Sequence, residues 1–136
     1  MKRSELRENI FKLLFRVEFN GMEEMKEQES LYFDTITLEE EKAISDKHQG
    51  FIKEKYRAIV EKLPQIDAEI EKISNGWQLN RIGKVELTIL RLAIYEIQYD
   101  EEVPTKVAIN EAVELAKKFG GEDAPSFING ILAKLA

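Results

Sequence analysis

The segment that decides the fold is GKVELTILRLAIYEIQY, residues 83–99. Valine, leucine, isoleucine and alanine recur on nearly every face of the helix that it would form, and a helix that is apolar all round belongs in a core. Arg91 and Glu96 interrupt the apolar surface, and we favour a structural role in which they satisfy buried polar groups or each other. We therefore expect residues 83–99 to form the central buried helix.

Helical patterns precede this segment. Ser4 is a candidate cap for an opening helix whose apolar residues follow at 3.6-residue spacing. Residues 22–33 form an acidic, weakly periodic segment that predicts a short helix. Thr37 and Glu40 have the spacing of a capping box, which predicts the start of a long helix that ends at Pro64.

Helical patterns also lie directly before the central segment and after it. Isoleucines at helical spacing predict a short helix over residues 66–73. Pro104 and Gly120 have the positions of a helix start and a helix end, and Asp123 can cap a last helix. No segment alternates with period two for long enough to form a sheet, so we predict an all-α fold of six to seven helices.

Composition bounds the function classes. With 136 residues, 43% of them apolar, the chain is long enough for one compact domain, which we place over residues 1–136. It contains no cysteine and one histidine, so we expect neither a disulfide framework nor a metal site. Phosphate-binding loops, the dinucleotide fingerprint and a nucleophile elbow are absent from the sequence. We therefore predict no catalytic residues and no cofactor, and expect that the protein is not an enzyme.

The N-terminal residues are charged and no window approaches 18 consecutive apolar residues. A membrane span requires such a stretch, and a secretory signal requires a shorter uninterrupted apolar stretch, which the N-terminal residues also lack. We therefore expect a cytoplasmic protein with no membrane partner.

Charge is distributed unevenly along the chain. The net charge is −6, which by itself argues against nucleic acid as a partner. Residues 1–16 nevertheless carry a net charge of +3, whereas residues 18–41 carry −8. A polyanion would be attracted to the first segment and repelled by the second. The alternative is that the basic residues only solvate the outer face of an amphipathic helix.

A row of aromatic residues lies off the apolar stripe of the opening helix. Phe11, Phe15 and Phe19 follow Arg7 at intervals of four residues, so they share one flank of that helix. Either a second layer of helices covers these rings, or some of them form an exposed patch for a partner.

Three blocks of the chain resemble the signature of a known family. They are LRLAIYEI (residues 90–97), VPTKVAINEAVELAKKFG (residues 103–120) and FINGIL (residues 127–132). The chain is similar, over essentially its whole length, to the NusB family of bacterial transcription antitermination factors. This resemblance implies an all-helical fold of two packed helical subdomains. It also implies pairing with the small-subunit ribosomal protein NusE, binding of boxA RNA from nascent ribosomal RNA transcripts, and a larger complex with NusA, NusG and RNA polymerase.

The resemblance also implies site residues. Arg3 and Arg7 match arginine positions of the family's N-terminal RNA-binding segment, and Lys2 and Lys12 extend that segment. Asp123 and Phe127 match positions near the family's RNA surface. Phe127 could stack on a base or pack internally. Positions that face NusE match Phe15, Phe19 and Glu86, and a carboxylate suits a basic ribosomal protein.

The chain departs from the family pattern in its first helix. The family often has a small residue, Gln and a Leu-Tyr pair there, where this chain has Phe11, Lys12, Leu14 and Phe15. The tyrosine hydroxyl is lost, and with it one hydrogen bond to the partner. The N-terminal arginine cluster is also thinner than in some relatives, which predicts weak RNA binding by the protein alone and strong dependence on NusE.

Two other functions remain open. The fold also occurs as the N-terminal domain of ribosomal RNA cytosine methyltransferases, although this chain has no methyltransferase domain. Alternatively, the protein is a purely protein-binding helical adaptor whose basic end is solvated. A homodimer that buries the basic helix would compete with RNA.

Overall fold

The computed structural model describes residues 1–21, 23–39 and 44–136. These residues form seven α-helices and three short 3-10 helices, and none of them belongs to a β-strand. The all-α prediction is therefore confirmed. The chain divides into two compact units, Met1–Val60 and Glu61–Ala136, in accord with the two helical subdomains that the resemblance implies.

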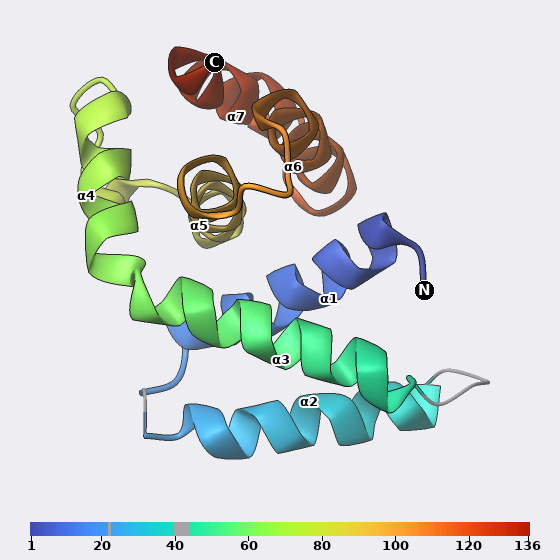
Figure 1. Ribbon diagram of the computed structural model, residues 1–136. Coiled ribbons are helices and arrows are strands. Elements are labelled where there is room, and N and C mark those ends of the chain that lie inside the picture. Colours follow the sequence, from blue (N-terminus) through green and yellow to red (C-terminus); the bar gives the residue numbers. More distant parts are fainter. Residues whose placement is uncertain (22, 40–43) are drawn as a thin grey trace. The chain divides into compact units, whose positions relative to one another are not determined.

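The first unit contains α1 (Arg3–Phe15), α2 (Met25–Glu39) and α3 (Asp46–Glu61), with a 3-10 turn, η1 (Arg16–Glu18), after α1. Figure 1 shows α2 and α3 side by side, and the Arg57 guanidinium of α3 joins them by donating to both carboxylate oxygens of Glu29 at 3.1 and 2.9 Å. The Tyr32 hydroxyl of α2 donates to Asn9 Oδ1 of α1 at 2.6 Å. The fully buried apolar side chains of α1 and α3 are Ile10, Leu13, Leu14, Ile52 and Ile59.

The predicted start of the long helix is wrong. Thr37 lies inside α2, which continues to Glu39 because residues 23–39 contain neither glycine nor proline to end it. The helix that ends near Pro64 begins instead at Asp46, where Ser45 Oγ accepts the backbone N–H of His48 at 3.2 Å. Ser45 is therefore the cap. Glu40, the other member of the predicted capping box, lies outside the described residues.

The predicted caps at Ser4, Asp123 and Gly120 have different outcomes. Ser4 lies within α1, whose N-cap position is Lys2, so that prediction is wrong. Asp123 does occupy the N-cap position of the last helix, but its side chain makes no capping hydrogen bond. Gly120 ends its helix as predicted, with its N–H donating to the Ala116 carbonyl at 2.9 Å. A Cβ at Gly120 would lie 2.5 Å from Ala124 Cβ, so the close approach of two helices there excludes a side chain.

The second unit contains α4 (Leu63–Ile73), α5 (Lys84–Tyr99), α6 (Thr105–Phe119) and α7 (Ala124–Leu132), with two 3-10 turns, η2 (Leu79–Arg81) and η3 (Ala133–Leu135). Helix α5 contacts α4, α6 and α7, and Figure 1 shows it end-on among them. Its Ile89, Leu90 and Ile94 are fully buried. The prediction that residues 83–99 form the central helix is confirmed.

Arg91 has a partner that the sequence pattern did not identify. Its guanidinium donates from Nε and Nη2 to the two carboxylate oxygens of Asp67 in α4, at 2.9 and 3.0 Å. The Arg91 side chain is only 10% exposed. A bidentate, charge-assisted contact of this kind satisfies a buried guanidinium and fixes α4 against α5.

Tyr56 of α3 provides a pH-dependent prediction. Burial, followed by the nearby Glu29 carboxylate, raises the pKa of Tyr56 from 10.0 to about 12. Because the folded pKa exceeds the unfolded one, the resulting stabilisation is fully present below pH 10 and is lost as the pH rises towards 12. We expect wild type to lose about 2–3 kcal/mol more unfolding free energy over that range than Tyr56→Phe does. Urea unfolding of both proteins on either side of the range measures this, and equal losses would contradict it.

Candidate nucleic-acid interface

Two exposed cations stand at the start of α1. Lys2 occupies the N-cap position and Arg3 is the first helical residue. Both side chains are exposed, and neither forms an ion pair with any residue that the structure describes. The free backbone N–H groups of the first turn add partial positive charge at the same end. The beginning of α1 is therefore an electropositive point that an anionic ligand can reach.

The other predicted cations of α1 do not extend this point into a continuous strip. Arg7 is buried, with 8% of its surface exposed. Lys12 is exposed, but nine residues along a helix turn it about 180° away from Arg3 and about 13 Å along the axis. Its ammonium lies 3.9 Å from a Glu8 carboxylate oxygen. The structure therefore does not bring the four predicted cations onto one surface.

Acidic residues dominate the next helix. Glu23, Glu24, Glu27 and Asp34, in or beside α2, are exposed. Arg16, the last residue of the basic segment, is engaged within the unit, since its Nη1 donates to Gln28 Oε1 at 3.0 Å. The exposed face of α2 thus carries negative charge that would repel a polyanion, as the charge distribution predicts.

The aromatic row of α1 runs from the interior to the surface. Phe11 is buried at 4% exposure, Phe15 is half-buried, and Phe19, just beyond η1, is 59% exposed. The ring centroids of neighbours lie 6.2 Å apart for Phe11 and Phe15 and 5.1 Å apart for Phe15 and Phe19. Phe11 is therefore covered, whereas Phe19 presents an exposed apolar surface, and its predicted contact with a partner stays a prediction.

Glu86 is a half-buried residue in the first turn of α5. Its carboxylate lies back over the helix start, where a Cβ at Gly83 would collide with Oε2 and a Cβ at Gly120 would lie 3.6 Å from Oε1. A carboxylate there is stabilised by the positive end of the helix. The side chain therefore has a structural role, and its predicted contact with a partner protein stays a prediction.

Asp123 and Phe127 lie one turn apart at the start of α7. Asp123 is exposed, and Phe127 is half-buried. The Phe127 ring meets the ring of Trp77 edge to face, with centroids 6.1 Å apart and an interplanar angle of 79°. Trp77 was not among the predicted site residues. Its signal in the sequence is that the single tryptophan follows directly on the Ser-Asn-Gly turn.

The predicted site residues fall into both units. Lys2, Arg3, Arg7, Lys12, Phe15 and Phe19 belong to the first unit, and Glu86, Asp123 and Phe127 belong to the second. Across the described part of the chain, no group of three or more acidic, histidine or cysteine side chains is arranged to hold a metal ion. No helix among the described residues is both long and apolar enough to cross a membrane.

Comparison with known sequences identifies relatives along the whole chain. A family model described as the NusB family matches residues 4–136. The chain is 49% identical over 136 residues to the transcription antitermination protein NusB of Agathobacter rectalis, with all of both chains covered. It is 50% identical over 135 residues to the protein of the same name from Lachnoclostridium phytofermentans, covering 99% of this chain and 98% of the relative.

Solved structures share the fold. Thermotoga maritima NusB superposes with a TM-score of 0.86 at 33% identity, covering 100% of this chain and 91% of that one. A structure of antitermination factors NusB and NusE in complex with dsRNA gives a TM-score of 0.83 at 24% identity, covering 98% and 94% of the two chains. At that identity the second likeness shows the fold alone.

Proposed function

Because the chain belongs to the NusB family, we propose that it is a transcription antitermination factor that pairs with NusE and binds boxA RNA of nascent ribosomal RNA transcripts. The observation that carries this proposal is the family match over residues 4–136, together with about half identity to named antitermination proteins. The family is one of transcription factors rather than enzymes, so no catalytic residue or cofactor is assigned.

The role extends to a larger assembly. Residues 1–136 act as one RNA-binding domain in the cytoplasm, and the complex with NusE joins the elongating RNA polymerase with NusA and NusG. This chain supplies the contacts to RNA phosphates. NusE raises the affinity for RNA above that of this chain alone. The small number of exposed, unpaired cations on α1 supports such a division, since phosphate binding strengthens with each cation that contacts the backbone.

We assign the contacts to RNA from the exposure of each predicted side chain. Lys2 and Arg3 bind phosphates at the start of α1, where the helix terminus adds to their field. Lys12 supplies a separate, weaker attraction because Glu8 lies beside it. Arg7, being buried, lies beneath the surface at the same helix and does not reach a phosphate directly. Asp123 and Phe127 belong to the RNA surface, where the Asp123 carboxylate accepts a hydrogen bond from a base amino group.

NusE contacts aromatic residues of the first unit and, separately, an acidic residue of the second. Phe19 is the anchor, since 59% of the residue's surface is exposed, and Phe15 supports it with a ring centroid 5.1 Å away. Aromatic side chains that are open to solvent and backed by other rings are frequent hot spots of protein interfaces. Glu86 provides negative charge towards a basic ribosomal protein.

A titration tests the proposed function. Labelled boxA RNA and a scrambled RNA of the same composition are titrated with the chain, alone and with purified NusE at a fixed ratio. We expect weak binding alone, and tighter binding that favours boxA when NusE is present. If NusE brings no gain and boxA no preference, the proposal fails and the protein-binding adaptor is favoured.

Phe19→Ala provides a second prediction. Loss of the exposed ring is expected to weaken NusE binding by about 10-fold or more, as for an interface hot spot. Phe51→Ala is the matched control, since Phe51 of α3 is also an exposed phenylalanine of the first unit, at 45%. Calorimetric titration of NusE into each variant measures the change. Equal affinities of wild type and Phe19→Ala would remove Phe19 from the interface.

The other functions make different predictions. In a methyltransferase module, the chain would act as part of an enzyme, whereas the relatives described above are named antitermination proteins.

A homodimer through α1 would make the affinity for RNA fall as protein concentration rises. Light scattering at several concentrations, with and without RNA, distinguishes this assembly from a monomer that binds RNA.

A further inference from the structure

The turn that follows α4 is fixed by several contacts. Asn75 and Gly76 have backbone φ angles of 54° and 85°, in the left-handed region that favours glycine and asparagine. The hydroxyl of Ser74, which is buried, donates to the Trp77 carbonyl at 2.9 Å. From η3, the Lys134 ammonium donates to the Ile73 carbonyl at 2.6 Å and to Asn75 Oδ1 at 2.7 Å. The backbone that leads to Trp77 is therefore fixed by hydrogen bonds from Lys134 and from the Ser74 hydroxyl.

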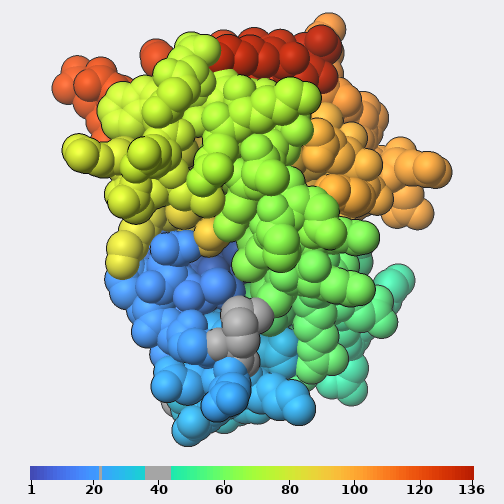
Figure 2. Space-filling view, turned by 90° about the vertical axis from the view of Figure 1, so that its left-hand side faces the viewer, coloured from blue at the N-terminus to red at the C-terminus, as the bar shows by residue number. Residues whose placement is uncertain are grey.

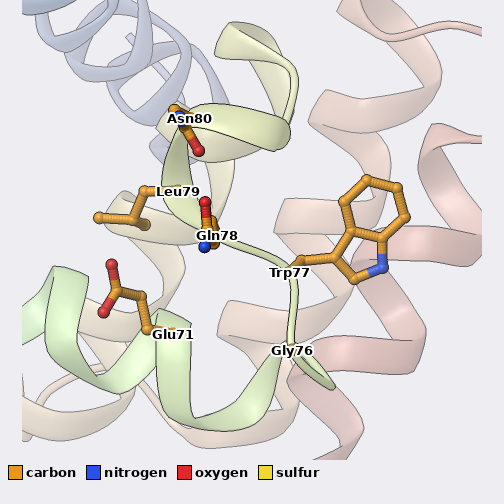
Figure 3. A pocket seen from close by; sticks show the side chains of 6 residues that line it. All are labelled: Glu71, Gly76, Trp77, Gln78, Leu79 and Asn80. Carbon is orange, nitrogen blue, oxygen red and sulfur yellow. The ribbon is translucent and has the colours of Figure 1, made fainter.

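This turn presents the indole of Trp77 at the surface. The side chain is 50% exposed, although tryptophan is the largest apolar side chain and is usually well covered. Figure 3 shows the indole on the opposite side of the loop from the side chains of Glu71 and Leu79. In Figure 2 the yellow-green segment that follows α4 lies at the surface. Phe127 meets the indole edge to face, and the 50% exposure of Trp77 leaves indole surface within reach of a flat ligand.

Polar and cationic groups surround the exposed indole. A surface hollow of about 330 Å³ is lined by Trp77 together with Asn75, Gly76, Gln78 and Arg81. Arg81 is exposed and forms no ion pair with a residue in the described ranges. Amides can donate to and accept from the edge of a base, and a guanidinium can bind the adjoining phosphate. An aromatic face with such neighbours has the composition of a site for an unpaired nucleotide.

We propose that Trp77 is a stacking platform for one unpaired base of single-stranded RNA. Phe127 braces the indole, Gln78 contacts the base edge, and Arg81 binds a neighbouring phosphate. This inference rests on the RNA-binding function proposed above and adds a base-contacting residue to it. It also gives Phe127 a definite task, since the ring supports the platform whether or not it touches RNA itself.

The surface around Trp77 fits a protein partner less well than it fits a single base. Docking sites usually present a contiguous apolar patch of several hundred Å². Around Trp77 the exposed neighbours in the chain are Asn75, Gly76, Gln78 and Asn80, which are polar or lack a side chain. A single ring in polar surroundings fits one base better than an apolar protein face.

Fluorescence tests the platform directly. Trp77 is the only tryptophan of the chain, so indole emission from this protein reports on this site alone. We expect single-stranded boxA RNA to quench that emission with the same midpoint as a labelled-RNA binding curve. A duplex of the same sequence should quench much less, because its bases are already stacked. The titration is run on the chain alone and repeated with NusE, after the effect of NusE without RNA has been recorded.

Variants measure the contribution of stacking. Trp77→Ala is expected to weaken boxA binding by about 5- to 150-fold, the range for loss of one base–aromatic stack, and Trp77→Phe should recover most of the affinity. Tyr99→Ala is the control, since Tyr99 is an exposed aromatic residue of the same unit, at 39%. Trp77→Leu keeps an apolar contact for Phe127 without a stacking face, so it separates loss of stacking from loss of packing.

The outcomes distinguish this inference from the function on which it rests. If wild type with NusE does not bind boxA, the proposed function itself fails. If wild type binds boxA without quenching and Trp77→Ala binds equally well, the stacking platform is overturned and the function stands. If NusE changes the emission and RNA does not, Trp77 faces a protein, and the platform is likewise overturned.

Discussion

Replacing Lys2 and Arg3 together by glutamate is expected to weaken boxA binding, measured with NusE present, by about 20-fold or more at moderate salt. Both side chains are exposed and lack ion-pair partners among the described residues, so their charge is available to phosphate. Two lost phosphate contacts should also make the dependence of log affinity on log salt shallower by about 1.4 to 2. Fluorescence anisotropy at several salt concentrations measures both quantities.

A matched variant controls for net charge. Lys26→Glu with Lys47→Glu makes the same change of charge at two exposed lysines of the same unit. We expect this control to retain most of the affinity and an unchanged salt slope, because its lysines lie outside the start of α1. If both double variants weaken binding equally, the overall charge of the protein decides affinity, and the assignment to Lys2 and Arg3 is wrong.

Asp67→Ala is expected to destabilise the second unit by about 3 kcal/mol, because it removes both charge-assisted hydrogen bonds from a buried guanidinium. The Arg91 side chain is only 10% exposed, so water cannot replace the carboxylate readily. The contact also joins α4 to the central helix, and its loss should loosen the turn that carries Trp77. Urea unfolding followed by circular dichroism gives the change in free energy.

Glu29→Ala is the control for that prediction. The pair of Glu29 with Arg57 has the same bidentate geometry, but the Arg57 side chain is 64% exposed and remains hydrated when its partner is removed. We expect a loss of about 1 kcal/mol or less. A cost equal to that of Asp67→Ala would mean that burial of the guanidinium does not determine the difference.

The central helix could be predicted from the sequence because apolar residues occur on nearly every face of it, and such a helix belongs in a core. The boundaries of surface helices were harder to predict from the sequence than the central helix. Thr37 with Glu40 and Ser45 both have the residue types of a helix cap, and local sequence does not decide between them. The structure uses Ser45, since α2 continues past Thr37.

The candidate site could be predicted only as a set of residue types. Charge counting located the basic segment, but it does not report burial, and Arg7 is buried while Lys2 and Arg3 are exposed. Contacts between distant residues were also beyond reach. Arg91 binds Asp67, 24 residues away, and Trp77 meets Phe127 of the last helix, and both depend on tertiary packing.

Site-specific photocrosslinking to boxA RNA tests the central claim most directly. A photoreactive residue is placed at Ser4 or at Ser30, which are both exposed serines of the first unit, beside the basic start of α1 and on the acidic helix α2 respectively. With NusE present, position 4 should crosslink to boxA RNA and position 30 should not. Crosslinks from position 30 with none from position 4 would contradict the account.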